Sequence, residues 1–192
     1  MSASPKGRLI VISGPSGVGK SSIVDAVLAR TDARFSVSAT TRAARPDEVE
    51  GTDYAFSMTR EEFGALREAG EILEWAEYGG NLYGTLRRAV LPLVEAGHDV
   101  ILDIENEGAK QIRAAFGDAL MIFIAPPGLE NLAKRLTARG DTSAEDMARR
   151  LGVAEDQMAE AYEVFDHIVV NDDLVDAIAS VLDILKEPHA QS

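Results

Sequence analysis

The chain has 192 residues, 46% of them hydrophobic, which is enough for one packed domain with inserted subdomains or for two small domains. It contains no cysteine, which excludes disulfides and thiolate metal sites and fits a reducing cytoplasm. The net charge of -13 argues against nonspecific nucleic-acid binding, and no apolar run resembles a signal sequence or reaches transmembrane length. We therefore expect a cytoplasmic protein without nucleic-acid or membrane partners.

Short apolar runs alternate with helical patterns along the chain, which is typical of a parallel α/β sheet. The patterns predict core strands at residues 8–13, 34–39, 99–104, 119–125 and 167–170. They predict helices at residues 20–30, 59–69, 85–96, 106–116, 128–138, 143–163 and 173–186. Thr59 and Glu62 form a capping-box pattern at the start of the second helix. Residues 40–84 are rich in charge, glycine and tyrosine, and we expect them to form a small α+β insertion.

The segment GPSGVGKS at residues 14–21 satisfies the phosphate-binding loop pattern G-x-x-x-x-G-K-[ST] at every fixed position. It follows the apolar run Leu9–Ile12 and precedes apolar residues at helical spacing, so it joins a strand to a helix. Its glycines let backbone N–H groups approach phosphate oxygens, while Lys20 reaches the β- and γ-phosphates and Ser21 ligates Mg²⁺. The pattern predicts a nucleoside triphosphate site formed by Gly14, Pro15, Ser16, Gly17, Val18, Gly19, Lys20, Ser21 and Ser22.

An acidic residue, Asp103, ends the apolar strand predicted at residues 99–104. A carboxylate in this place holds the metal of many phosphate-loop proteins, so we expect Asp103 to bind Mg²⁺ through water, opposite Ser21. The alternative is a strand-end aspartate that caps the next helix.

Arginines flank an irregular stretch at residues 137–143 between two predicted helices. Arg135 and Arg139 are four residues apart and share a helix face, and Arg149 and Arg150 follow the stretch. One interpretation is a closing lid that brings guanidinium groups onto a transferring phosphoryl group. The other is solvated surface charge with carboxylate partners. The residues alone favour neither the lid nor the surface-charge interpretation.

The expected insertion contains the motifs SVSATTRAAR, GTDYAF, ILEWA and LYGT, and the rest of the chain contains SGPSGVGKS, RLTARG and VNDD. On these motifs, which run in order from residue 13 to residue 173, the chain resembles guanylate kinase, in the nucleoside monophosphate kinase group of P-loop proteins. The resemblance implies a three-layer P-loop α/β fold with a central five-stranded parallel sheet, a small α+β GMP-binding insertion and a mobile lid. The core would comprise residues 1–33, 86–136 and 151–192, the insertion residues 34–85, and the lid residues 137–150.

The resemblance also implies a reaction, the Mg²⁺-dependent transfer of the γ-phosphoryl group of ATP to GMP, giving ADP and GDP. The GMP phosphate would be held by Ser38, Arg42, Arg45, Tyr54 and Tyr83. Glu74 and Thr85 would read the guanine, with Asp103 and Glu105 near the nucleoside. The catalytic residues would be Lys20, Arg135, Arg139 and Arg150. Asn171 is placed in the ATP site near the adenine, and helix capping by this segment is an equally good account.

The guanine assignment is chemically reasonable, because guanine presents N1–H and its 2-amino group as adjacent donors that one carboxylate accepts. Adenine would leave Glu74 desolvated and unpaired. The nucleophile, a phosphate oxygen, is already ionised near neutral pH, so no general base is required. Catalysis would consist of positioning and charge neutralisation by Lys20, Mg²⁺ and the lid arginines.

The chain departs from the family pattern D-I-D-x-Q-G, having Asp103-Ile-Glu105-Asn-Glu107-Gly in its place. The longer Glu105 leaves its contact open, and Glu107 receives no role. Two other functions stay open: a noncatalytic guanylate kinase-like domain that binds phosphopeptides, and a kinase for another phosphorylated acceptor such as ribose bisphosphate. The oligomeric state is open as well, with a homodimer as one candidate.

Overall fold

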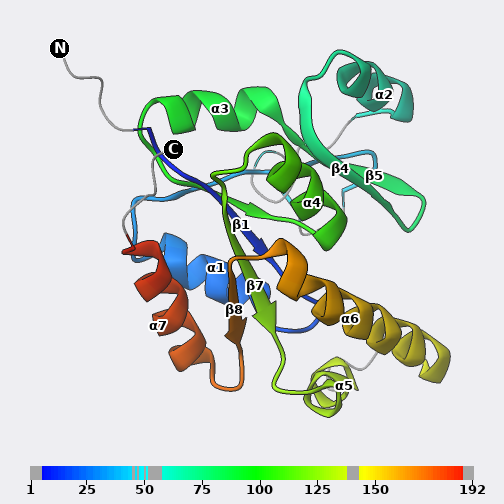
Figure 1. Cartoon of the computed structure of the whole chain (residues 1–192). Helices are drawn as coiled ribbons and strands as arrows, with labels where there is room; N and C mark the ends of the chain where they lie inside the picture. The colour runs from blue at the N-terminus through cyan, green and yellow to red at the C-terminus, as the bar shows by residue number, and fades with distance from the viewer. Residues whose placement is uncertain are drawn as a thin grey trace. The chain divides into compact units, whose positions relative to one another are not determined.

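The computed structural model describes residues 6–44, 46, 48, 49, 51, 58–137 and 143–187, whose strands form two sheets (Figure 1). The larger sheet is five-stranded, in the order β2 (Arg34–Phe35), β6 (Val100–Asp103), β1 (Leu9–Ser13), β7 (Leu120–Ala125) and β8 (His167–Val170). Its outer pairs, β2 with β6 and β7 with β8, are parallel. The smaller sheet is antiparallel, in the order β3 (Ala39–Thr40), β5 (Asn81–Leu86) and β4 (Ile72–Tyr78). The predicted α/β class with a five-stranded parallel sheet is confirmed.

The chain divides into two compact units. Unit 1 comprises Met1–Ile10, Asp32–Leu102 and Glu107–Ala119, and unit 2 comprises Val11–Thr31, Asp103–Asn106 and Leu120–Ser192. Among the described residues, no helix combines the length and apolar character needed to cross a membrane.

Unit 2 contains the end of β1, strands β7 and β8, and four helices: α1 (Lys20–Leu28), α5 (Leu129–Thr137), α6 (Ala144–Val164) and α7 (Leu174–Leu185). Strand β7 is a continuous buried apolar run, as expected of a strand covered on both faces. Helix α1 packs against α7, and each helix buries one apolar stripe. Helices α5 and α6 pack together around the buried side chains of Leu132, Leu136 and Ala154.

Unit 1 contains the smaller sheet, helix α2 (Arg60–Glu68), helix α3 (Arg87–Glu95) and most of helix α4 (Asn106–Ala115). Strands β4 and β5 form a hairpin whose two turn residues, Gly79 and Gly80, have φ angles of 58° and 77°. Glycine adopts these angles without strain, which suits a two-residue turn. The buried ring of Phe63 on α2 lies against Gly84 of β5, where a Cβ atom would come within 2.9 Å of the ring.

Most element boundaries agree with the prediction within two residues, and the Thr59–Glu62 capping box is present. The strand predicted at residues 34–39 is wrong in extent. Only Arg34–Phe35 pair with β6, and Ala39–Thr40 pair with β5 in the other sheet. The third predicted helix begins two residues late, because Thr85 and Leu86 complete β5. In both places strand pairing overrides the local pattern: Ala39–Thr40 pair with a strand distant in sequence, and Thr85 and Leu86 pair with β4 of their own hairpin.

Candidate active site

The phosphate-binding loop of unit 2 joins the fully buried strand β1 to helix α1, which begins at Lys20. Its last glycine, Gly19, caps the helix with a φ of 99°, and a Cβ atom there would lie 2.5 Å from Nδ2 of Asn171. A side chain at this position would therefore be both strained and obstructed. The loop places the N-terminus of α1 directly after the turn, and a helix N-terminus in this place is an arrangement that binds phosphate.

Two charged groups of unit 2 form an ion pair next to this loop. Nζ of Lys20 lies 2.7 Å from Oδ1 of Asp103, and the two side chains are 14% and 22% exposed. Asp103 therefore has Lys20 as its partner. Among the described residues, no three histidine or carboxylate side chains form a metal cluster. One carboxylate and one hydroxyl, from Asp103 and Ser21, are nevertheless a suitable donor set for Mg²⁺, which takes most of its other ligands from water and substrate phosphates.

The turn of the loop is held from outside by two side chains that converge on one carbonyl oxygen. Arg135 of α5 and Asn171, which follows β8, donate hydrogen bonds to the oxygen of Val18 at 3.0 and 2.7 Å. The Arg135 guanidinium also donates to the backbone oxygens of Asn171 and Asp172 at 2.8 and 3.4 Å. Arg135 thus contacts the phosphate loop and the segment after β8. The cap of α7 is Asp173.

Of the other arginines predicted to belong to a lid, the structure describes only some. Arg139 lies outside the described residues. Arg149 and Arg150, in the first turns of α6, both donate to the carboxylate of Asp146, Arg150 at 2.7 Å. These bonds keep the pKa of Asp146 below its usual range, with the Arg149 contribution the largest. Ser143 accepts a hydrogen bond from Asp146 N and caps α6, directly after the part of the predicted lid that the structure does not describe.

In unit 1, the two predicted guanine-reading residues lie opposite each other on neighbouring strands. Glu74 of β4 pairs with Thr85 of β5, and the Thr85 hydroxyl donates a 2.6 Å hydrogen bond to Oε1 of Glu74. Both residues are buried, at 4% and 0% exposure. Burial raises the pKa of Glu74 to about 7, against the opposing effect of the Thr85 hydrogen bonds. A carboxyl group that is buried with Thr85 as its hydrogen-bond partner retains capacity to accept further hydrogen bonds.

The structure describes some of the residues of unit 1 that are predicted to bind the GMP phosphate. Ser38 lies half-buried between β2 and β3, and Arg45 and Tyr54 lie outside the described residues. Arg42 makes a two-pronged ion pair with Glu48, with N–O distances of 2.9 and 2.8 Å. A hydrogen bond also links Arg42 to Tyr83, and these contacts, the one with Glu48 foremost, raise the pKa of Arg42. The structure therefore brings Arg42 and Tyr83 together, with a carboxylate on the same guanidinium.

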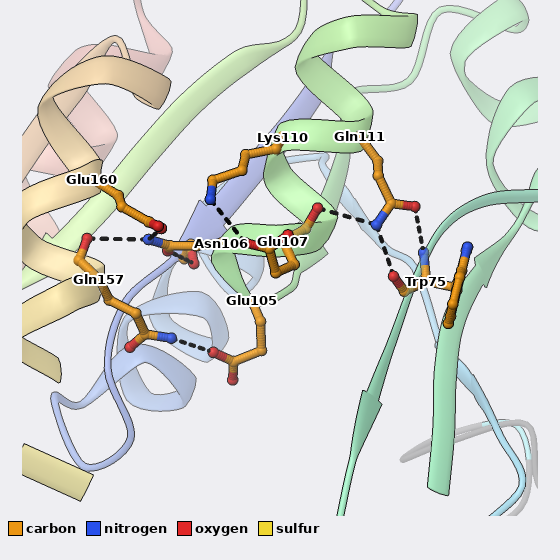
Figure 2. Close-up of polar contacts among 9 residues, drawn as sticks. Trp75, Glu105, Asn106, Glu107, Lys110, Gln111, Gln157 and Glu160 are labelled. Carbon is orange, nitrogen blue, oxygen red and sulfur yellow. Dashed lines mark hydrogen bonds and ion pairs between the residues drawn. The ribbon is translucent and has the colours of Figure 1, made fainter. Parts of the chain in front are cut away.

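Polar residues that sequence reasoning did not assign surround the start of α4 (Figure 2). In unit 2, Asn106 is 3% exposed, accepts a hydrogen bond from the Ser13 hydroxyl and donates to Gln157 O of α6 at 3.1 Å. The Gln157 amide donates to the Glu105 carboxylate at 2.8 Å. In unit 1, Gln111 bonds to the backbone of Trp75. Apart from these residues, Glu48, the partner of Arg42, is another residue that sequence reasoning did not assign. A buried asparagine or glutamine gives no periodic signal, so the sequence alone does not reveal these partners.

The comparisons with known proteins agree with one another. The family model described as guanylate kinase matches residues 6–188. A guanylate kinase of Symbiobacterium thermophilum is 47% identical over 189 residues, covering 98% of this chain and 89% of that protein. One of Rubrobacter xylanophilus is 48% identical over 182 residues, covering 94% of each. The crystal structure of guanylate kinase from Anaplasma phagocytophilum matches with a TM-score of 0.78 and 33% identity, covering 98% of this chain and 89% of that one.

The family match covers nearly the whole chain and both units, including the phosphate loop, the Glu74 strand and helix α6. The similarity also extends over 89% and 94% of these two relatives, so the match is not limited to the widespread phosphate loop. The chain belongs to the guanylate kinase family.

Proposed function

We propose that this chain transfers the γ-phosphoryl group of ATP to GMP, giving ADP and GDP, in a reaction that requires Mg²⁺. The observation that carries the proposal is the buried Glu74 carboxyl group, whose partner in the structure is the Thr85 hydroxyl. A phosphate loop indicates a triphosphate donor in general, whereas a buried carboxyl group of this kind fits the adjacent N1–H and 2-amino donors of guanine.

The donor nucleotide occupies the loop of unit 2 in this proposal. The backbone N–H groups of Gly14–Ser22 and the Lys20 ammonium bind the phosphates. In the part of the chain that the structure describes, no group donates to the buried Oδ1 of Asn171. An acceptor without a donor is costly inside a protein, and the exocyclic amino group of adenine supplies one. This orphan acceptor supports a role for Asn171 in the ATP site.

Ser21 and Asp103 would hold Mg²⁺, Asp103 through water. When bound there, the ion would supply positive charge to the phosphates. When ATP binds, Lys20 would exchange its partner, the Asp103 carboxylate, for phosphate oxygens. The Asp103 carboxylate would then be available to hold the water ligands of Mg²⁺.

The acceptor nucleotide binds through unit 1. Arg42, Tyr83, Ser38, Arg45 and Tyr54 bind its phosphate, and Glu74 and Thr85 bind its guanine, with Asp103 and Glu105 assigned to the nucleoside. Because Arg42 already binds the two oxygens of the Glu48 carboxylate, its guanidinium has the geometry required for a phosphate. An ionised phosphate oxygen of GMP attacks the γ-phosphorus in line, and the bond from phosphorus to the β–γ bridging oxygen breaks, leaving ADP. Lys20, Arg135, Arg139 and Arg150 are proposed to neutralise the charge that develops.

The two other candidate functions receive less support. A phosphopeptide-binding domain has no use for the Lys20–Asp103 pair beside an intact phosphate loop, and a ribose bisphosphate acceptor has no base for Glu74 to contact. A coupled assay that measures ADP formation with GMP, AMP, dTMP and UMP, each with and without Mg²⁺, tests all three. We expect turnover with GMP and Mg²⁺ only. Turnover that prefers another acceptor, or none with GMP, would overturn the proposal.

A further inference from the structure

The side-chain amide of Gln111, on helix α4, is bonded entirely to backbone groups (Figure 2). Trp75 N donates to Gln111 Oε1 at 3.1 Å, and Gln111 Nε2 donates to Trp75 O at 2.8 Å. Nε2 also donates to the Glu107 oxygen one turn earlier in its own helix, at 3.1 Å. With both ends of the amide engaged, its orientation is determined: a flipped amide would oppose donor to donor and acceptor to acceptor.

This contact lies at an open edge of the smaller sheet. Among the described residues, strand β4 is the last in the order β3-β5-β4, so no described strand of that sheet pairs with its outward backbone groups. The paired donor and acceptor of an amide imitate the backbone of a strand, and Gln111 therefore takes the place of a neighbour at one residue, Trp75. The outward N–H and C=O groups of an edge strand are ordinarily unpaired. Because those of Trp75 are bonded to Gln111, the backbone of Trp75 can move less.

The residue before Trp75 is Glu74, and a second irregularity lies on its other side. Along β4, Ile72 pairs with Leu86 and Glu74 with Thr85, so two steps on β4 match one step on β5. Leu73 is thus the extra residue of a β-bulge, a feature that redirects neighbouring side chains and weakens local pairing. Glu74 is held between a bulge, which loosens the strand, and the Gln111 contact, which restrains it.

Successive side chains of a strand point to opposite faces, so the restraint acts on Glu74 through the backbone and not by touching its carboxyl group. The Trp75 ring, on the other face from Glu74, has the Arg67 guanidinium carbon 4.8 Å from its centroid. This contact restrains the ring and not the strand backbone. On one side the β4 backbone pairs with β5, and on its outward side the amide of Gln111 bonds to it at Trp75.

We propose that Gln111 is a positioning residue for guanine selection, which keeps the β4 backbone, and with it the Glu74 carboxyl group, in register with Thr85. The inference rests on the proposed function of Glu74. A group that reads a base by two hydrogen bonds must be held within about 0.5 Å of its productive position. Loss of the Gln111 contact lets the bulged strand move, so guanine binding weakens while the phosphate loop in unit 2 is unaffected.

Gln111→Met is the sharpest test, because methionine keeps the length and packing of the side chain without either hydrogen bond. We expect KM for GMP to rise roughly tenfold, and the preference in kcat/KM for GMP over AMP to fall by a similar factor. The KM for ATP should not change. Lys110→Ala is the matched control: it is the preceding residue of α4, its Nζ pairs with Glu107 at 2.8 Å, and it should retain wild-type selectivity.

Gln111→Glu provides an independent variant for the case in which Gln111→Met does not fold. Its carboxylate still accepts from Trp75 N but opposes the Trp75 and Glu107 backbone oxygens acceptor to acceptor, so selectivity should fall at least as far as in Gln111→Met. A variant that lowers the melting temperature yet keeps the wild-type KM for GMP and the wild-type GMP preference would show a purely structural role and overturn the inference. Absence of GMP phosphorylation by the wild-type chain would instead overturn the proposed function, and this inference with it.

Discussion

The Thr85 hydroxyl donates a 2.6 Å hydrogen bond to the buried Glu74 carboxyl group from the directly opposite position on the neighbouring strand. This bond favours the ionised carboxyl group, whereas burial disfavours it, and burial prevails, so the pKa of Glu74 rises to about 7. The residue assigned to guanine therefore changes its charge near pH 7. The raised pKa of Glu74 should therefore affect how folding stability and GMP affinity depend on pH.

Glu74 should make folding stability depend on pH in a predictable direction. Its pKa is about 7 when folded and near the ordinary value of 4.5 when unfolded, so the folded state binds the proton more tightly. The stability that this provides is complete at low pH and is lost as the pH rises through about 7. We expect Glu74→Gln to gain stability over wild type by up to about 3 kcal/mol between pH 5 and pH 8. Denaturant unfolding of both chains at each pH measures this. A difference that is constant with pH contradicts it.

The same group should govern the affinity for GMP. Only the ionised Glu74 carboxylate can accept both guanine donors, so below pH 7 binding must first remove a proton. We expect KM for GMP to rise as the pH falls below 7, by at most tenfold per pH unit, and to level off above 7. The phosphate of GMP also titrates in this pH range, with a pKa of about 6. Glu74→Gln is the control, because the titration of the phosphate affects the variant and wild type equally. Equal slopes for the two chains would remove Glu74 from guanine binding.

Substitution of Lys20 tests the proposed ATP site. Lys20→Ala removes the cation that pairs with Asp103 and that is proposed to reach the β- and γ-phosphates. We expect turnover to be abolished while GMP still binds to unit 1 with its wild-type dissociation constant, measured by calorimetry. Turnover near the wild-type rate would contradict the assignment of the phosphate loop. Loss of GMP binding as well would point to general unfolding, which circular dichroism detects.

Asn106 should stabilise unit 2, because it connects the end of β1 to α6. Asn106→Ala leaves the buried Ser13 hydroxyl without its acceptor, at a cost of about 1–3 kcal/mol in the free energy of unfolding. A double-mutant cycle with Ser13→Ala isolates the contact, and we expect the two single costs not to add. Strict additivity would mean that the Ser13–Asn106 bond contributes nothing.

The parts of this structure that local physics determines are the parts that the sequence predicts. The phosphate loop depends on glycines and flanking apolar runs, and the Thr59–Glu62 cap depends on residues three apart, and both are present. The pairing of Ala39–Thr40 with β5 depends on a strand distant in the chain, and the bulge at Leu73 depends on how β4 pairs with β5, which the local pattern of apolar residues does not reveal. Gln111 and Asn106 act through contacts 36 and 51 residues away, which no periodicity encodes.

The selectivity of Glu74→Ala tests the central claim most directly. Ratios of kcat/KM for GMP and AMP, measured for wild type and variant in the same coupled assay, compare guanine with adenine while the phosphate contacts stay constant. We predict a strong wild-type preference for GMP that falls by at least a hundredfold in Glu74→Ala, in keeping with the discrimination of about 10⁴ that a buried hydrogen-bonding group can provide. A folded Glu74→Ala variant with the wild-type preference for GMP would contradict the account.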